Sequence, residues 1–122
     1  MTIVSISCFA ILGALARYYQ SNLVSAMFGK SFPYATLSIN VFGSFLMGLL
    51  FFLTLERLTL SPSLRAGVLT GFLGAYTTFS TFSIETYSLI QDGNARKALI
   101  YSLGSVLLSI GAVFLGATLG RR

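Results

Sequence analysis

The sequence predicts an all-α membrane protein with four transmembrane helices in each subunit. Of its 122 residues, 55% are hydrophobic and only 9% are charged, whereas a soluble domain carries about 25% charged residues. The mean hydropathy is +0.84. The apolar residues also fall into four long segments with short polar connections. Most of the protein surface is therefore expected to face lipid.

Each apolar segment has a length that suits a membrane helix. A hydrocarbon core about 30 Å thick requires roughly 20 helical residues. The last three segments reach that length unaided, and the first does so only if Arg17 lies in or near the bilayer. A single domain, residues 1–122, is expected to contain helices at about residues 3–27, 35–55, 66–90 and 98–119.

The basic residues lie in ones and twos, mostly at the ends of the apolar segments. Lysine and arginine anchor membrane helices at such places. The net charge of +5 forms no basic stripe with interleaved aromatic residues, so a nucleic-acid partner is not predicted. Cys8 is the only cysteine and histidine is absent, which excludes an intrachain disulfide and a Cys/His metal site. A cleavable signal peptide is not expected, because the first sixteen residues contain no lysine or arginine.

The charges give no preferred orientation in the membrane. With four spans, one side of the bilayer holds four basic residues: Arg57, Arg65, Arg121 and Arg122. The other side holds three, Lys30, Arg96 and Lys97, or four if Arg17 reaches it. The positive-inside rule therefore decides nothing. Either one loop dominates insertion, or the chain inserts both ways and pairs as an antiparallel dimer.

Two predicted helices carry polar or small residues along one face. In the second these residues are Asn40, Gly43, Ser44, Met47 and Gly48; in the fourth they are Tyr101, Ser105, Ser109, Gly116 and Gly120. Small residues let helices approach closely, and serines hydrogen-bond between helices. A polar stripe could equally line a water-filled path. Packing is the favoured interpretation for the glycines, and both remain open for Asn40 and the hydroxyls.

Arg17 and Glu85 are the two charges expected at membrane depth. A charge at the centre of a span costs at least a few kcal/mol, so such residues usually pair or face a cavity. For Glu85 either a proton-coupled carboxylate or a fixed hydrogen-bond acceptor is consistent with the sequence. The long side chain of Arg17 could instead reach the interface.

The stretch GAYTTFSTFS, residues 74–83, interrupts the third apolar segment with hydroxyl groups. Gly71, Gly74 and the β-branched threonines are poor residues for a helix interior, so a break is expected near 74–78. Broken backbone at membrane depth must be satisfied by protein or by a polar cavity, and it often coordinates ions.

The phenylalanines of this stretch favour an anion over a cation. An aromatic ring is negative on its face and positive at its edge. Phe79 and Phe82, three residues apart, occupy neighbouring positions on one helical face. Their edges, the hydroxyls and Asn40 would together replace part of an anion's hydration shell. The alternative is ordinary packing of two rings at helical spacing.

The motif TTFSTFS-x-E at residues 77–85, with GFLG at 71–74 before it, resembles the signature of the Fluc (CrcB-type) fluoride channels. GALARY at residues 13–18 and N-x-x-G-S-F-x-x-G at residues 40–48 also match. The resemblance covers all four segments in order. It implies an antiparallel, dual-topology homodimer in the cell membrane, with the third helix of each subunit broken and two pores that export fluoride passively.

The resemblance also implies roles for individual residues. The pore phenylalanines would be Phe79 and Phe82, and the pore asparagine would be Asn40. The hydroxyls of the polar track would be Ser80, Thr81, Tyr101, Ser105 and Ser109. The charged residues of the motifs would be Arg17 and Glu85. A structural Na⁺ at the dimer axis would be held by backbone carbonyls of Gly74 and Thr77. Tyr76 is a local variation, whose hydroxyl either reaches the sodium site or packs elsewhere.

Two other functions compete with a channel. A proton-coupled small multidrug exporter would share the four spans and would use Glu85, but such exporters carry their glutamate in the first helix. This chain has no acidic residue before Glu56 and no tryptophan. A non-transporting assembly subunit would use the polar faces only for packing. An enzyme is not expected, since the chain has three acidic residues and no nucleophile–base pair.

Overall fold

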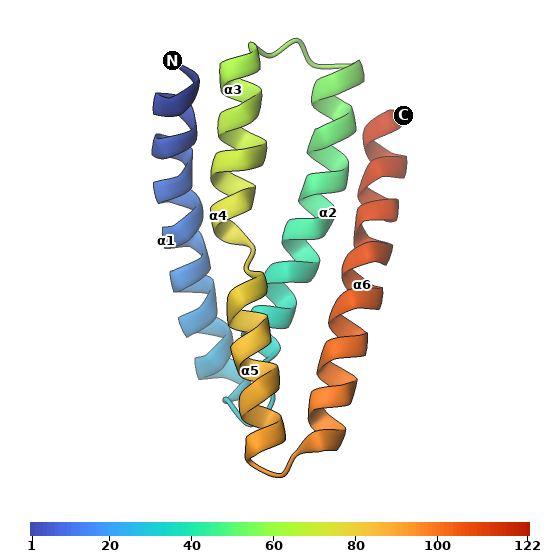
Figure 1. Ribbon diagram of the computed structural model, residues 1–122. Helices are drawn as coiled ribbons and strands as arrows, with labels where there is room; N and C mark the ends of the chain where they lie inside the picture. The colour runs from blue at the N-terminus through green and yellow to red at the C-terminus, as the bar shows by residue number, and fades with distance from the viewer.

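The computed structural model, which covers residues 1–122, is a bundle made only of helices (Figure 1). Three segments are continuous: α1 (Thr2–Phe28), α2 (Tyr34–Glu56) and α6 (Ala95–Arg121). The third segment along the chain is divided into α3 (Pro62–Ala66), the π-helical η1 (Gly67–Leu73), α4 (Gly74–Tyr76) and α5 (Phe79–Gln91). Both termini and the α2–α3 connection lie at one end of the bundle, at the top of Figure 1.

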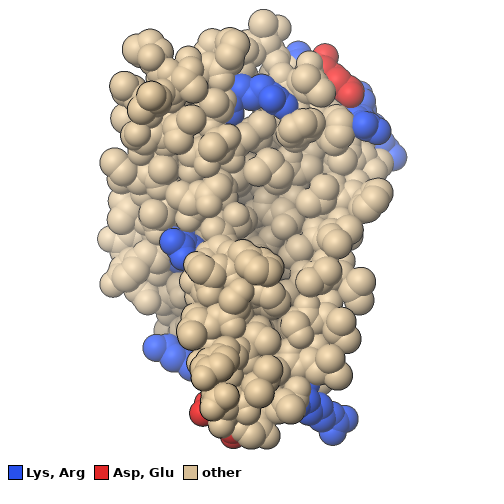
Figure 2. All heavy atoms as spheres, in the orientation of Figure 1, with Lys and Arg blue, Asp and Glu red and all other residues tan.

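The surface of the bundle is that of a membrane protein. The helices α1, α2 and α6 are long and apolar enough to cross a bilayer. Only 17 of the 122 residues are buried, and many large apolar side chains are exposed. Figure 2 shows most charged groups near the two ends of the visible face, with a basic group at mid-height on the left in an otherwise uncharged middle. Lipid, or another protein surface, must therefore cover the middle of the bundle.

Local signals explain where the helices begin and end. Ser61 precedes α3 and its Oγ accepts a hydrogen bond of 3.2 Å from the Leu64 amide, which is a favourable cap. Gly29 and Gly93 have positive φ angles in the two connections at the opposite end. The last helix begins three residues before the predicted residue 98. Its first turn contains Arg96 and Lys97, which are good helix formers although they are charged.

Glycines hold α2 and α6 in close contact. A Cβ atom added at Gly116 would lie 2.8 Å from the Leu49 amide nitrogen, and one at Gly48 would lie 2.9 Å from that of Ala117. Gly120 meets the backbone of Leu49 in the same way. Because these positions have no room for a side chain, the packing interpretation of the three glycines is confirmed.

Glycines also bring α1 against η1. A Cβ atom at Gly71 would lie 2.6 Å from the carbonyl oxygen of Ile6. The break predicted near residues 74–78 is confirmed, although the helix continues through both Gly71 and Gly74, with wide π-helical turns in η1. The break follows at Thr77 and Thr78. Gly71 serves close helix packing instead.

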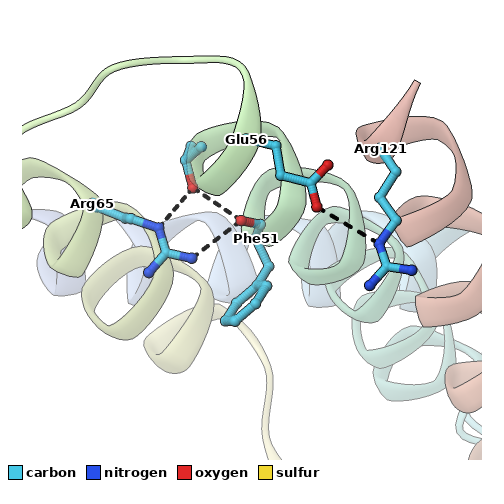
Figure 3. A network of polar contacts seen from close by, with 5 residues as sticks. Phe51, Glu56, Arg65 and Arg121 are labelled. Atoms are coloured by element: carbon cyan, nitrogen blue, oxygen red, sulfur yellow. Dashed lines mark hydrogen bonds and ion pairs between the residues drawn. The ribbon is translucent and has the colours of Figure 1, made fainter.

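Two arginines make polar contacts at the end of the bundle where the termini lie (Figure 3). Arg65 donates from Nε to Thr54 Oγ1 at 2.9 Å and from Nη2 to the Phe51 carbonyl at 3.1 Å. This joins α3 to the end of α2. Arg121 lies 3.9 Å from Glu56, measured between Nε and Oε1, and both side chains are exposed. These contacts fix the connections around the spans and contribute little charge to the interior.

Candidate functional site

The helix break consists of two extended threonines. Thr77 has φ −83° and ψ 157°, and Thr78 has φ −151° and ψ 117°. Branching at Cβ favours such extended geometry. Thr78 then begins α5 by capping it, since its Oγ1 accepts from the Thr81 amide at 3.1 Å. The double threonine therefore both ends one helix and begins the next.

Asn40 of α2 satisfies the backbone that the break leaves open. Its Oδ1 accepts from the Thr78 amide at 2.9 Å, and its Nδ2 donates to the Thr78 carbonyl at 3.0 Å. In a continuous helix that amide would bond to the Gly74 carbonyl, which now lacks its helical donor. The amide group has a second N–H on Nδ2 that remains available. Asn40 thus shapes the break and still has one donor to offer.

A groove of about 390 Å³ opens beside the break. It brings together residues from α2, α5 and α6 that are far apart in the sequence. The predicted pore residues among its lining are Asn40, Phe79, Phe82, Ser105 and Ser109. Thr77, Thr78 and Ser44 also line it. Ser105 is buried, and its Oγ has no hydrogen-bond partner. The groove therefore contains a free hydroxyl next to aromatic rings.

Three aromatic rings form a row from the groove toward Glu85. The ring centroids of Phe79 and Phe82 are 5.4 Å apart, and those of Phe82 and Tyr101 are 5.1 Å apart. Phe79 is 77% exposed, whereas Tyr101 is almost completely buried. The Tyr101 hydroxyl donates to Glu85 Oε1 at 2.9 Å. Glu85 is thereby held as a hydrogen-bond acceptor at one end of the row.

A second hollow, of about 390 Å³, lies on the α1 side of the break. Arg17, Thr36, Thr78 and Thr81 are among its lining residues. The Arg17 Nε is buried and has no hydrogen-bond partner. No acidic side chain forms an ion pair with Arg17, since the one ion pair in the chain joins Arg121 and Glu56. Arg17 thus faces a cavity, and Thr78 borders both hollows.

The structure divides the predicted polar set among several places. Ser80 is exposed, and its Oγ lies 3.3 Å from Thr78 Oγ1. Thr81 lines the hollow with Arg17, while Tyr101 is buried against Glu85 outside both hollows. Glu85 lines a third hollow, with Lys30 and Lys97, at the end opposite the termini. The five hydroxyls therefore do not form one continuous lining within a single chain.

Comparison with known proteins decides the family. Residues 4–117 match the family described as "CrcB-like protein, Camphor Resistance (CrcB)". The chain belongs to the CrcB family. A relative from Acidithiobacillus ferrooxidans is 62% identical over 112 residues, which cover 92% of this chain and 90% of that relative. CrcB relatives from Magnetococcus marinus and Geobacter metallireducens are 50% and 45% identical over 121 residues, 99% of this chain and 98% of each relative. All three carry the name "Fluoride-specific ion channel FluC".

Two features of this CrcB protein were not assigned from the sequence. Thr78 caps the N-terminus of α5 and is the residue that Asn40 binds. The sequence pattern that indicates such a cap is a threonine directly before a new amphipathic segment. Gln20 receives the hydrogen bond of the Tyr76 hydroxyl. The Tyr76 side chain therefore points toward α1, which settles the direction of this hydroxyl. Gln20 lies three residues after Arg17, on the same side of the helix. This spacing is the only sequence feature that could have pointed to Gln20.

Proposed function

We propose that this CrcB protein is a fluoride channel, through which the ion crosses the cell membrane passively along the groove beside the helix break. The observation that supports it best is the buried, unpartnered hydroxyl of Ser105 in a groove shared with Asn40, Phe79 and Phe82. An unpaired buried donor costs free energy, so its retention favours a ligand. The name that the three relatives share supports fluoride as that ligand.

The chemistry of the groove suits a small, strongly hydrated anion. Fluoride loses its water only where donors replace it at close range. The Ser105 hydroxyl and the second N–H of Asn40 are such donors. The edges of Phe79 and Phe82 add weak positive potential without the desolvation cost of a buried cation. Chloride is larger and less strongly hydrated, so selection of fluoride over it would require donors at close range.

The two hollows at the break supply an entrance and a passage. Arg17 and Thr81 line one hollow, and Ser105 and Ser109 line the other. The positive charge of Arg17 attracts anions into its hollow, where no carboxylate pairs with it. Thr78 borders both. Fluoride would therefore pass close to the break.

The phenylalanines provide a direct test. Vesicles containing Phe79→Ile or Phe82→Ile should release fluoride far more slowly than vesicles with the wild type, as followed with a fluoride-selective electrode. The oligomer should remain intact on a sizing column, because isoleucine keeps an apolar side chain at each position. Undiminished fluoride efflux in both variants would remove the rings from the mechanism.

The proposed assembly is an antiparallel, dual-topology homodimer with two pores. Three facts support it: the even charge tally, the lack of any buried residue in α5, and the exposure of Phe79. A second copy would cover these surfaces and complete the lining that one chain leaves divided. Cysteine cross-linking should capture antiparallel neighbours. Recovery of parallel neighbours alone would contradict this assembly.

A structural Na⁺ between the two subunits is also proposed. Sodium prefers oxygen ligands, and carbonyls freed by a broken helix provide them. The Gly74 carbonyl has lost its helical donor to Asn40. The Thr77 hydroxyl donates to the Leu73 carbonyl at 2.9 Å, and the extended backbone of Thr77 leaves its own carbonyl outside the helix. These residues fit a sodium ion, which would supply positive charge at the break.

Removal of sodium tests that proposal. Dialysis against sodium-free buffer should lower the thermal stability of the dimer or its fluoride flux, and added sodium should restore it. If neither quantity changes, the carbonyls of Gly74 and Thr77 do not hold a required ion.

A further inference from the structure

A chain of hydrogen bonds runs from the end of α4 across the bundle. The Tyr76 hydroxyl donates to Gln20 Oε1, Gln20 Nε2 donates to Ser38 Oγ at 3.3 Å, and Ser38 Oγ donates to the Ala35 carbonyl at 2.7 Å. Every link donates in the same direction, and the last acceptor is backbone of α2. Such chains strengthen each member by polarisation.

The chain starts at the residue that immediately precedes the break. Tyr76 is the last residue of α4, and Thr77 after it is extended. The Tyr76 ring is 3% exposed and stacks on Phe72 with their centroids 6.0 Å apart. A Cβ atom at Gly43 would lie 3.2 Å from this ring, so α2 fits closely against it. The packing of the ring and the hydrogen bond of the hydroxyl together fix the position of the Tyr76 side chain.

We propose that Tyr76, Gln20 and Ser38 form a positioning chain that fixes the N-terminal side of the break and thereby sets the rate of ion passage. Asn40 holds the opposite side through Thr78. None of the three residues lines the groove beside the break, so they act through the backbone of Thr77. This inference rests on the proposed passage of fluoride at the break.

The hydroxyl of Tyr76 can be removed without removing the buried ring, so its role in positioning the break can be separated from a general contribution to stability. The phenol ring already contributes the buried apolar surface, and loss of the hydroxyl removes only the link to α1 and α2. A displacement of about 1 Å is enough to weaken a site whose own residues are all present. The chain should therefore affect the current through each channel, and not merely the number of channels that fold.

Tyr76→Phe tests the chain with a minimal change. We expect amide hydrogen exchange in the segment 74–81 to become about five-fold faster, as for loss of one hydrogen bond. The fluoride current of a single channel in a planar bilayer should fall about three-fold or more. Ser38→Ala should reproduce part of both effects, and Ser38→Thr, which keeps the hydroxyl, should restore wild-type values. Gln20→Leu combined with Tyr76→Phe should be no worse than Gln20→Leu alone.

The matched control is Tyr87→Phe, since Tyr87 lies on α5, is 57% exposed and makes no side-chain hydrogen bond. It should leave exchange and current unchanged. Wild-type exchange at residues 74–81 in Tyr76→Phe, or a wild-type single-channel current, would overturn the positioning role. A wild type that conducts no fluoride would instead refute the proposed function, and a conductance role for the chain with it. In that case the exchange data would still show whether the chain holds the break.

Discussion

The two halves of the broken segment differ in how they meet the rest of the bundle. The first half contains η1, whose Gly67, Leu69, Gly71 and Leu73 are all buried. The second half, α5, contains no buried residue, although it has 13 residues and η1 has only 7. The first half packs backbone to backbone against α1 through Gly71. The second half presents aromatic rings and hydroxyls at its surface.

The first half, which contains η1, therefore serves as a scaffold, and the exposed face of α5 serves as a functional surface. Close packing gives η1 its rigidity, and that rigidity holds the end of the break nearest Tyr76. The residues of α5 are free to face an ion path or a second subunit because the bundle itself does not need them for its core. Asn40 joins the two halves through Thr78. Each variant below changes the scaffold, the groove beside α5, the junction at Asn40, or a part of the bundle away from all three.

The junction should give the largest effect. Asn40→Leu removes both hydrogen bonds to Thr78 and leaves its amide and carbonyl unpaired, at about 1–3 kcal/mol for each group. Fluoride flux should be lost and the thermal midpoint in detergent should fall. Asn40→Gln, which keeps both the acceptor and the donor of the amide without adding a charge, should lose less stability. Equal midpoints for the two variants would show that the Thr78 contact is not what matters.

The scaffold half should respond in stability. Gly71→Ala places a methyl group 2.6 Å from the Ile6 carbonyl oxygen, and such overpacking costs about 1–3 kcal/mol. A lower thermal midpoint in detergent is expected. Gly104→Ala is the control, because a Cβ atom there meets nothing within 4 Å. If both variants melt alike, α1 and η1 are not held by close backbone contact.

The groove that α5 shares with α6 should respond in flux alone. Ser105→Ala removes a hydroxyl that has no protein partner, so the fold loses nothing. Fluoride efflux should fall about ten-fold, as for one hydrogen bond to a charged group. Ser102→Ala removes a hydroxyl from the same helix that bonds only to α6 backbone carbonyls, and its efflux should match the wild type. Similar efflux from both variants would argue against Ser105 as an ion ligand.

The smallest effect is expected at the end with the termini. Arg121→Gln breaks an ion pair of 3.9 Å between exposed side chains, and such pairs contribute about 0–1 kcal/mol. Flux and thermal midpoint should stay close to wild-type values. A large loss of flux would mean that this end of the bundle belongs to the ion path.

Sequence patterns predicted the helices well but not every contact between them. Segment length and hydropathy indicated the spans, because the bilayer imposes a length that composition reveals. The glycines of α2 and α6 were interpreted correctly as packing residues. Gly71 lies within a helix although glycine has a low helix propensity, because tertiary packing against α1 decides its conformation.

The candidate site was predicted in part for a similar reason. Periodicity placed Asn40, Ser105 and Ser109 on inward faces, and the structure brings them to one groove with the phenylalanines. It did not indicate that Thr81 and Tyr101 lie outside that groove, since helical spacing gives the face but not the neighbour. The bond from Tyr76 to Gln20 joins residues 56 positions apart in sequence, and no local pattern encodes such a pair.

The central claim is that the groove beside the break conducts fluoride and excludes chloride. In the most direct measurement, wild-type vesicles are loaded with both anions. The efflux of each anion is then followed with its own selective electrode once the opposing membrane potential has been removed. The account predicts rapid fluoride efflux with chloride retained. Retention of both anions, or equal release of both, would contradict it.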